Sequence, residues 1–407
     1  MEFGKKHVLI WGSIFLLLVG LVLSIHQLYV MFATLALLAP ASYLMSRGTL
    51  STISVRREAS GIMKEGQEHP VRLYVRNDGV RRRYLFTVTD QLPDGLEVTG
   101  PGTTIIDALA ADQEMVVTYT LRARRRGVYR LGPVQLGHWD LLGLFAFARQ
   151  AGDVDELVVH PTPEKLPESW LRAIALNALR QPRRRFRGEG TEFYGTRRYL
   201  PGDDLRRVDW KSTARRGELI VRQYERAEAT DCTVVLDLQR QVHSGADEDS
   251  TLERGVKLAA SVAVQLLERG SRVGLLATGS KNWSQAASAD PRQKLKILDA
   301  LARVQADTDA DLAEQIRLRR GLMPKGGMVV IISPRRTAAA LELGAALVDE
   351  GYAVTWMIPA APWRSLTAQE MSEDQLAARL QVRGVRAWVV DPGRPLALGM
   401  RGGRRVA

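Results

Sequence analysis

The chain has 407 residues, with 57 Lys or Arg against 45 Asp or Glu, so its formal net charge is +12. This length predicts two to three domains at about 100–200 residues each, and the positive charge favours anionic partners such as lipid headgroups, nucleic acid or acidic proteins. The single cysteine, Cys232, excludes an intrachain disulfide and favours a reducing compartment; its apolar surroundings predict a buried, inert thiol.

Residues 1–50 contain two apolar runs, Val8–Ile25 and Leu28–Met45. Each run of about 18 residues spans about 27 Å as a helix at about 1.5 Å per residue, close to the thickness of a bilayer's hydrocarbon core. The sequence therefore predicts a hairpin of two transmembrane helices with its turn at His26-Gln27.

Basic residues flank this hairpin at both ends, Lys5 and Lys6 before it and Arg47 after it. Because positive flanks stay in the cytoplasm, we expect a multi-pass protein of the bacterial inner membrane with both termini cytoplasmic. The alternative is a cleaved signal peptide ending near Ala39-Pro40-Ala41. The apolar stretch is much longer than an h-region of about 7–15 residues, which argues against it.

Residues 51–163 alternate apolar and polar positions, as in Val71-x-Leu73-x-Val75 and Val117-x-Tyr119-x-Leu121. A period of two indicates half-buried strands. Turn signals such as Asn77-Asp78-Gly79 and Pro93-Asp94-Gly95 separate these runs at the spacing of an antiparallel sandwich. We therefore predict one immunoglobulin-like β-sandwich domain.

Residues 229–407 alternate short β-branched runs with amphipathic segments, which predicts an α/β domain with a doubly wound, mostly parallel sheet. Ser250-x-x-Glu253 has the spacing of a capping box and starts the clearest helix, which Gly270 ends. The expected strands are Thr233–Leu238, Arg272–Thr278, Met328–Ser333, Ala353–Ile358 and Ala387–Val390.

Residues 164–228 form an Arg-rich connector that opens with Arg183-Arg-Arg-Phe-Arg187 and carries both signs of charge, with aromatic residues and glycines between the charges. This mixture argues against a plain solvated run or a disordered tail. Its motif comprises Glu192, Phe193, Arg197, Tyr199, Pro201, Gly202, Asp203, Asp204, Arg206, Val208, Asp209, Trp210, Lys211, Ala214, Arg215, Glu218, Leu219, Arg222 and Glu225.

On these residues the chain resembles the bacterial membrane proteins known as domain of unknown function 58. The resemblance extends to the helical hairpin, the β-domain and a von Willebrand factor type A-like C-terminal domain. It implies a neighbourhood of MoxR-type AAA+ ATPases and transglutaminase-like membrane proteins, and it implies no established reaction.

The motif has three physical interpretations. Its carboxylates and arginines can form a structural belt after the Pro201-Gly202 turn, with Trp210 as an apolar anchor. Alternatively, Arg197, Arg206, Lys211 and Arg215 form a docking surface for an anion or a partner. Finally, Asp203 and Asp204 with Asp209-Trp-Lys211 superficially match metal-dependent nucleases. The short spacing after a turn argues against this third interpretation, because such residues usually come from adjacent strands.

A von Willebrand type A metal site would need oxygen ligands in an Asp-x-Ser-x-Ser pattern after the first strand. Here the matching positions are Asp237, Gln239 and Gln241, and Arg240 adds a repelling charge. We therefore expect a degenerate site without tightly held metal and no cofactor. Glutamine carbonyls leave weak Mg²⁺ coordination as the alternative.

Together these patterns predict a non-enzymatic, membrane-anchored interaction or scaffold protein whose partner, implied by the resemblance, is an AAA+ ATPase. The chain contains no Gly-x-x-x-x-Gly-Lys-Ser/Thr loop, His-Glu-x-x-His or Gly-x-Ser-x-Gly motif. The first alternative is a binder of anionic lipid or, with less support, nucleic acid, through patches such as Arg81–Arg83 and Arg124–Arg126. A metal-dependent hydrolase ranks last.

Overall fold

The computed structural model describes residues 2–59, 61–100, 102–171, 173, 187–200, 204–205, 208–225, 231–246, 249–361, 363, 367 and 370–401. The chain divides into two compact units, Met1–His160 and Pro161–Ala407. The first unit contains the predicted hairpin and β-domain. The second contains the predicted connector and α/β domain.

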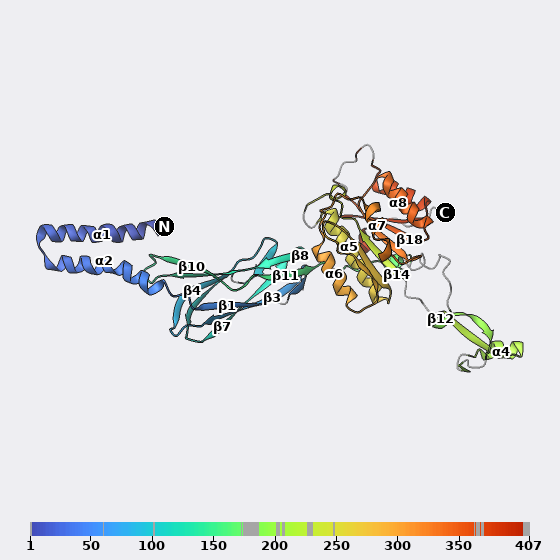
Figure 1. Ribbon diagram of the computed structural model, residues 1–407, viewed down its shortest axis with the longest axis horizontal. Coiled ribbons are helices and arrows are strands. Elements are labelled where there is room, and N and C mark those ends of the chain that lie inside the picture. Colours follow the sequence, from blue (N-terminus) through green and yellow to red (C-terminus); the bar gives the residue numbers. More distant parts are fainter. Residues whose placement is uncertain are drawn as a thin grey trace. The chain divides into compact units, whose positions relative to one another are not determined.

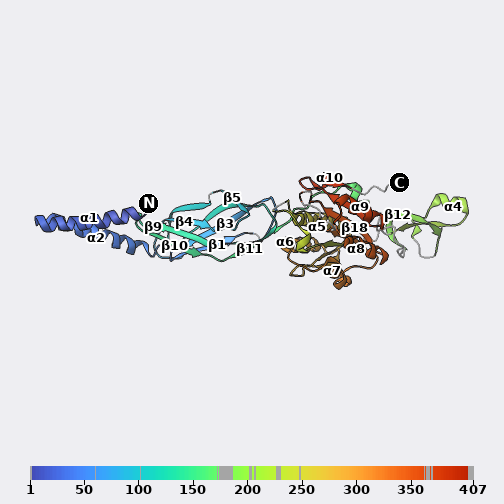
Figure 2. The same ribbon diagram turned by 90° about the horizontal axis from the view of Figure 1, so that it is seen from above.

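Two helices open the first unit, α1 (Glu2–Leu23) and α2 (His26–Ser46), and both views show them side by side (Figure 1, Figure 2). Lys5–Leu23 and His26–Ser46 are long and apolar enough to cross a membrane, and only 11% and 6% of these windows are buried. The turn lies slightly before the predicted His26-Gln27, because Ser24 has a positive φ of 52° and α2 already starts at His26.

The rest of this unit is a mainly antiparallel β-sandwich, in which β2 and β11 pair in parallel. Its two four-stranded sheets have the orders β1-β3-β7-β5 and β10-β9-β4-β6, and a third sheet has the order β2-β11-β8. This immunoglobulin-like β content agrees with the predicted class. The strands are β1 (Ile53–Glu58), β2 (Ile62–Lys64), β3 (Glu68–Asn77), β4 (Arg83–Asp90), β5 (Leu96–Thr99), β6 (Thr103–Leu109), β7 (Glu114–Ala123), β8 (Gly127–Leu131), β9 (Val134–Trp139), β10 (Ala146–Ala151) and β11 (Asp155–His160).

Side chains from both four-stranded sheets form one core, which includes Leu73, Phe86, Ile106, Leu121 and Leu136. Burial alternates along β3 and β7, because successive side chains of a strand point to opposite faces. The predicted turn Pro93-Asp94-Gly95 lies between β4 and β5, and Asn77-Asp78-Gly79 starts at the last residue of β3.

One ion pair crosses the sandwich interior. Arg57 binds both carboxylate oxygens of Asp90 at 3.1 and 2.6 Å, and their side chains are only 2% and 4% exposed. Its third nitrogen contacts Asp155 at 2.7 Å. Because charge-assisted, bidentate pairs have fixed geometry, this arginine links three segments of the sandwich.

The second unit contains a seven-stranded sheet of order β16-β15-β14-β17-β18-β19-β20. The neighbours from β15 to β19 pair in parallel, and only β16 and β20 at the edges are antiparallel. The strands are β14 (Asp231–Leu236), β15 (Arg272–Ala277), β16 (Gln285–Ser288), β17 (Met328–Ile332), β18 (Ala353–Pro359), β19 (Arg386–Val390) and β20 (Met400–Arg401). The five predicted strands are therefore confirmed within one or two residues.

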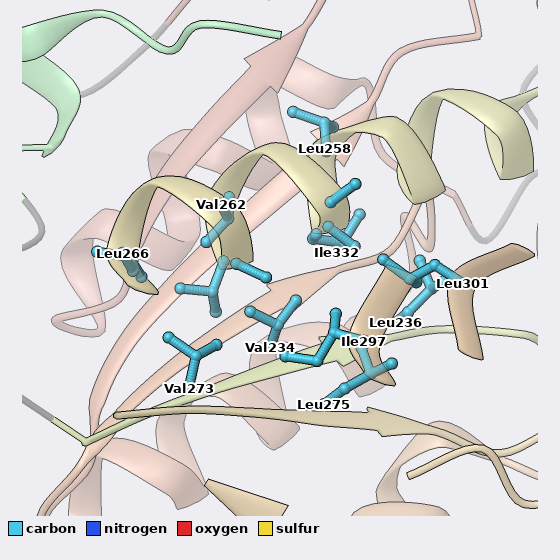
Figure 3. Close-up of a cluster of buried hydrophobic side chains, with 14 of the residues drawn as sticks. Val234, Leu236, Leu258, Val262, Leu266, Val273, Leu275, Ile297, Leu301 and Ile332 are labelled. Atoms are coloured by element: carbon cyan, nitrogen blue, oxygen red, sulfur yellow. The ribbon is translucent and has the colours of Figure 1, made fainter. Parts of the chain in front are cut away.

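Helices cover both faces of this sheet. Figure 3 shows Leu258, Val262 and Leu266 of α5, with Ile297 and Leu301 of α6, against Val234, Leu236, Val273, Leu275 and Ile332 of the sheet. On the opposite face, α7, α8 and α9 pack on residues such as Val235, Ile331 and Trp356. The helices are α5 (Thr251–Glu268), α6 (Gln293–Arg303), α7 (Leu312–Leu318), α8 (Ala338–Asp349), α9 (Glu373–Val382) and α10 (Leu396–Gly399), with short 3₁₀ turns at Arg240–Val242 and Arg320–Leu322.

Strand order fixes where this domain can form a site. Numbered in chain order within the sheet, the strands run 3-2-1-4-5-6-7, so the order reverses between β14 and β17. In doubly wound sheets ligands bind outside the carboxyl ends of the strands at such a switch point. Here the residues after Leu236 and Ile332 meet at that edge, because these two residues are the last pair of the β14 and β17 ladder.

Candidate functional site

The predicted connector contains a folded arm, which we define as β12 (Arg187–Arg198), α4 (Trp210–Arg216) and β13 (Ile220–Glu225). β12 and β13 pair antiparallel, with Arg198 opposite Ile220. Figure 1 shows α4 at the tip of this hairpin. The motif predicted from sequence therefore lies on a two-stranded ribbon with a short helix at its end.

Capping residues hold both ends of α4 in place. The Asp209 carboxylate accepts a hydrogen bond from the Ser212 N–H at 3.2 Å, which satisfies one of the unpaired N–H groups at the helix start. Gly217 ends the helix in the left-handed conformation at φ 68°, where glycine has no steric penalty. The Thr213 hydroxyl accepts from the Ile220 N–H at 3.0 Å and so joins helix and strand.

Around α4 the arm separates buried from exposed apolar residues. Val208, Ile220 and Val221 are buried, whereas Trp210 is 66% and Leu205 58% exposed. Trp210 is therefore not the apolar anchor that the sequence suggested. It is exposed on a helix that also carries three exposed basic side chains, Lys211, Arg215 and Arg216.

The remaining motif residues have varied surroundings. Arg197 is half-buried and donates to the Arg198 carbonyl at 2.9 Å, and the Tyr199 N–H donates to Leu219 at 2.8 Å. Asp204 is exposed. Pro201, Gly202, Asp203 and Arg206 lie outside the described residues.

Two of the three acids in the nuclease-like interpretation, Asp204 and Asp209, belong to the described residues. Asp209 uses its carboxylate to cap α4, and Lys211 is exposed on the same helix. Residues 204 and 209 lie on the connection between the two strands rather than on neighbouring strands of a sheet. Asp209 therefore has a structural role as the cap of α4.

The second candidate site is the switch point of the α/β sheet, where Asp237 follows β14 and is 1% exposed. One carboxylate oxygen accepts from the Ser333 hydroxyl at 2.7 Å, and the other accepts from the Gln239 N–H at 3.1 Å. Ser333 follows β17, and its carbonyl accepts from the Trp356 indole N–H at 3.3 Å. The carboxylate is thus held between the two central strands.

Arg335 supplies the positive charge at this site. Its guanidinium lies 3.6 Å from Asp237, contacts Asp311 at 2.6 Å and donates to the side-chain oxygen of Gln239. The Arg335 side chain is 10% exposed and that of Asp237 is 2% exposed. The Asp237 carboxylate is thus bound by Ser333 and the Gln239 N–H, and the Gln239 side-chain oxygen by Arg335, with the guanidinium charge close to both residues.

The neighbouring Arg336 forms a second buried cluster. It contacts Glu373 at 2.9 Å and Glu370 at 3.9 Å, and its side chain is 4% exposed. The Arg336 carbonyl accepts from the Met371 N–H at 2.9 Å. Two adjacent arginines after β17 thus bind different sets of acids at the carboxyl end of the sheet.

The last predicted position of the degenerate site, Gln241, lies in the 3₁₀ turn Arg240–Val242 and is exposed. After this turn, the His243 Nε2–H donates to the Asp237 carbonyl at 2.8 Å, and Nδ1 forms a hydrogen bond with the Thr251 hydroxyl at 3.1 Å. Burial lowers the pKa of His243, although the bond to the Asp237 carbonyl opposes that shift. Among the described residues, no group of three or more His, Cys, Asp or Glu side chains has an arrangement that could hold a metal ion.

The site residues predicted from the sequence did not include Arg335 and Arg336. The signal available was their position directly after a buried strand, in Ser333-Pro334-Arg335-Arg336. Basic residues there can reach the carboxyl ends of neighbouring strands, but the sequence did not indicate which acids they would meet.

Part of the chain matches a known family. Residues 195–344, from within β12 to within α8, match the family described as "Protein of unknown function DUF58". The predicted resemblance is confirmed for this segment, which contains most of the arm and the switch point.

Curated relatives match over similar stretches. An uncharacterized protein of Mycobacterium tuberculosis (strain ATCC 25618 / H37Rv) is 30% identical over 152 residues, which are 36% of this chain and 47% of that protein. The uncharacterized protein YeaD of Bacillus subtilis (strain 168) is 22% identical over 199 residues, 48% of each chain. The aligned part therefore spans about half the length of these relatives.

Solved structures offer slighter likenesses. The CARDB domain of a Pyrococcus furiosus protein is 13% identical and covers 26% of this chain and 86% of its own, with a TM-score of 0.19. A cohesin module from Clostridium perfringens is also 13% identical and covers 27% and 98%, with a TM-score of 0.19. Similarity of this degree supports no statement on function.

Proposed function

We propose that this protein is a membrane-anchored, non-enzymatic interaction protein whose arm docks onto a protein partner. The observation that carries this proposal is the exposed Trp210 on α4, a helix that also carries the exposed Lys211 and Arg215. Tryptophan and arginine are the residues that most often dominate binding energy in protein interfaces. A large exposed aromatic side chain on a capped, ordered helix is better explained by a partner than by a structural belt.

The partner's chemistry follows from the surface of α4. That helix carries Lys211, Arg215 and Arg216 and no acidic residue, so its field is positive. A complementary surface has an apolar pocket for the indole ring and carboxylates around it. The family resemblance makes a MoxR-type AAA+ ATPase the proposed partner.

The α/β domain supports a binding role without a metal. Its strand order and the position of Asp237 at the end of β14 are consistent with a von Willebrand factor type A-like domain. In this proposal Arg335 replaces the metal ion, because its guanidinium supplies the positive charge that Asp237 requires. The switch point then acts as a fixed surface rather than as a cation-dependent ligand site.

The two N-terminal helices give the proposed location. They are long and apolar enough to span a bilayer, and basic residues flank both ends of the hairpin. We propose the bacterial inner membrane with both termini in the cytoplasm, where an ATPase partner would also be found. Protease added outside spheroplasts should therefore leave residues after Arg57 intact; digestion there would contradict this orientation.

The docking role is tested by affinity purification of the full chain from solubilised membranes, with and without ATP. The Trp210→Ala chain should recover much less of the AAA+ ATPase, because loss of a hot-spot residue costs about 2 kcal/mol or more, roughly 30-fold in affinity. Leu318→Ala removes a side chain of equal exposure, 66%, from α7 and is the matched control.

The charge component has its own test. Replacing Lys211 and Arg215 by Glu should weaken recovery of the ATPase and reduce its dependence on salt, since surface charges mainly steer association. Equal recovery of the ATPase by wild type, Trp210→Ala and the charge-reversed chain would refute the arm as its docking element.

A further inference from the structure

The loop between β9 and β10 has a fixed shape that exposes apolar side chains. The Asp140 N–H donates to the Phe145 carbonyl at 3.1 Å, and the Phe145 N–H donates to the Asp140 carboxylate at 2.7 Å. The Gly143 N–H donates to the Asp140 carbonyl at 2.9 Å. These bonds close the loop at its base, and Leu141 and Leu142 between them are 81% and 39% exposed.

This loop contacts both membrane-length helices. Ser42 of α2 donates a hydrogen bond to the Asp140 carboxylate. The Tyr43 ring packs edge-on against Phe145 with centroids 5.3 Å apart, and the Lys6 ammonium of α1 lies 4.9 Å from the centre of the same ring. Figure 1 and Figure 2 both place the start of α1 beside this edge of the sandwich.

The link from α2 to β1 is also held. The Arg149 guanidinium of β10 donates to the carbonyls of Leu50 at 2.6 Å, Ser51 at 3.0 Å and Ile53 at 3.2 Å. Leu50 is 5% exposed, so the link is packed as well as hydrogen-bonded. The sandwich is therefore attached to the helices by the β9–β10 loop and by the link between α2 and β1. The depth of the β9–β10 loop in a bilayer is then set by the point along α2 that it contacts.

That position lies inside the predicted span. Ser42 is four residues before Ser46, the last residue of α2, which corresponds to about 6 Å at about 1.5 Å per residue. Interfacial elements typically bury their apolar side chains about 5–10 Å into the boundary between headgroups and acyl chains. If α2 crosses the bilayer, the β9–β10 loop reaches this boundary.

A basic loop lies at the same end of the sandwich. In the β3–β4 connection, the Asp78 N–H donates to the Thr52 carbonyl at 2.9 Å and Arg83 donates to the Thr52 hydroxyl at 3.1 Å. Thr52 comes directly before β1, next to the held link. The tip of this connection carries Val80, which is 93% exposed, followed by the exposed Arg81 and Arg82.

We propose that the end of the sandwich next to the helices is a lipid-binding surface. Leu141, Leu142 and the 49% exposed Trp139 enter the interface of the cytoplasmic leaflet, while Arg81 and Arg82 bind anionic headgroups. Aromatic and apolar side chains beside basic ones are the composition of interfacial anchors. The sandwich is then fixed against the bilayer rather than free on a tether. This inference rests on the proposed membrane anchoring of α1 and α2.

The test uses the full chain in nanodiscs of phosphatidylethanolamine and phosphatidylglycerol. In a Cys232→Ala chain, single cysteines at Leu141, Ile14 and Val154 receive a nitroxide spin label. Ile14 lies in the middle of α1 and reports whether the hairpin is inserted. Val154 is 55% exposed and follows β10, at the opposite end of that strand from the loop.

The collision rates of the nitroxide with oxygen and with a water-soluble nickel complex give its depth. We expect the label at Ile14 to be deep, that at Leu141 to lie about 5–10 Å below the headgroup boundary, and that at Val154 to be in water. A deep Ile14 with Leu141 in water overturns the inference and leaves the membrane anchor intact. Ile14 in water refutes the anchor itself.

Changing the charge of the lipid distinguishes the apolar β9–β10 loop from the basic β3–β4 connection. A label at Val80 should lose nickel accessibility in discs with phosphatidylglycerol compared with discs of phosphatidylcholine alone, and Arg81→Glu with Arg82→Glu should abolish that difference. The Leu141 label should be immersed in both kinds of disc. Immersion of either label only after a protein partner is added would assign this surface to that protein and overturn the lipid proposal.

Discussion

The replacement Arg335→Met tests how the switch point is stabilised. At 3.6 Å and an effective dielectric constant of about 20, the attraction between Arg335 and Asp237 is about 4.6 kcal/mol. The methionine avoids the cost of burying a guanidinium, and Asp237 keeps its bonds to Ser333 and Gln239. We therefore expect a loss of about 3 kcal/mol, near the lower end for an uncompensated buried charge.

The assay is hydrogen exchange of the full chain in detergent micelles, followed by mass spectrometry of peptides from β14 and β17. A loss of about 3 kcal/mol accelerates exchange through unfolding by roughly 150-fold, since each 1.4 kcal/mol is tenfold. Arg303→Met is the matched control. Its pair with Asp299 is more exposed, at 25% and 42%, and i,i+4 surface pairs of this kind contribute only about 0.3–0.5 kcal/mol.

A second replacement tests whether the unpaired charge of Asp237 causes this loss of stability. Asp237→Asn combined with Arg335→Met removes both charges, so the double variant should be more stable than Arg335→Met alone by about 1–2 kcal/mol. If Arg335→Met exchanges like the Arg303→Met control, or if adding Asp237→Asn brings no recovery, the idea that Arg335 neutralises a buried carboxylate is wrong.

Four further outcomes are expected. Isothermal titration of the full chain with Mg²⁺ or Mn²⁺ should show no micromolar binding, and such binding would contradict the proposed role of Arg335. Asp209→Ala should destabilise α4 by about 1 kcal/mol, measured by hydrogen exchange of the α4 amides. Unchanged protection of these amides would show that Asp209 does not stabilise the helix as its cap. Burial lowers the pKa of His243 in the folded protein. The contribution of His243 to folding stability should therefore be complete above pH 6.5, the ordinary histidine pKa, and should decline as the pH falls below 6.5; His243→Asn should flatten this part of the dependence of stability on pH. Arg57→Leu should destabilise the sandwich by about 3–5 kcal/mol because Asp90 stays buried without its partner, and a thermal midpoint equal to that of wild type would refute this.

Much of the fold was predictable because its signals are local. Alternation in Val71-x-Leu73-x-Val75 indicated a strand with one buried face, and the side chains of β3 are buried at these positions. The start of α5 was predicted from Ser250, whose side chain accepts from the Glu253 N–H at 3.2 Å. Each of these features is set by residues within a few positions of one another.

The arm was only partly predictable. Its motif showed that the segment was not disordered, but charge and aromatic residues at mixed spacing gave no period for strands or a helix. The exposure of Trp210 could not be read from its composition, since a tryptophan of this kind is as easily buried. It depends on the fold of the arm, in which β12 pairs with β13, Ile220 and Val221 are buried, and Trp210 at the start of α4 is exposed.

By itself the sequence determined the membrane-length helices, the change from period-two to α/β patterning and the loss of hydroxyl ligands after Asp237. These depend on the composition of short segments. The tertiary structure alone decided which side chain compensates Asp237. Gln239 and its partner Arg335 are 96 positions apart in the chain and meet only because β14 and β17 are neighbours in the sheet. Contacts of this kind arise from strand order, which no local pattern encodes.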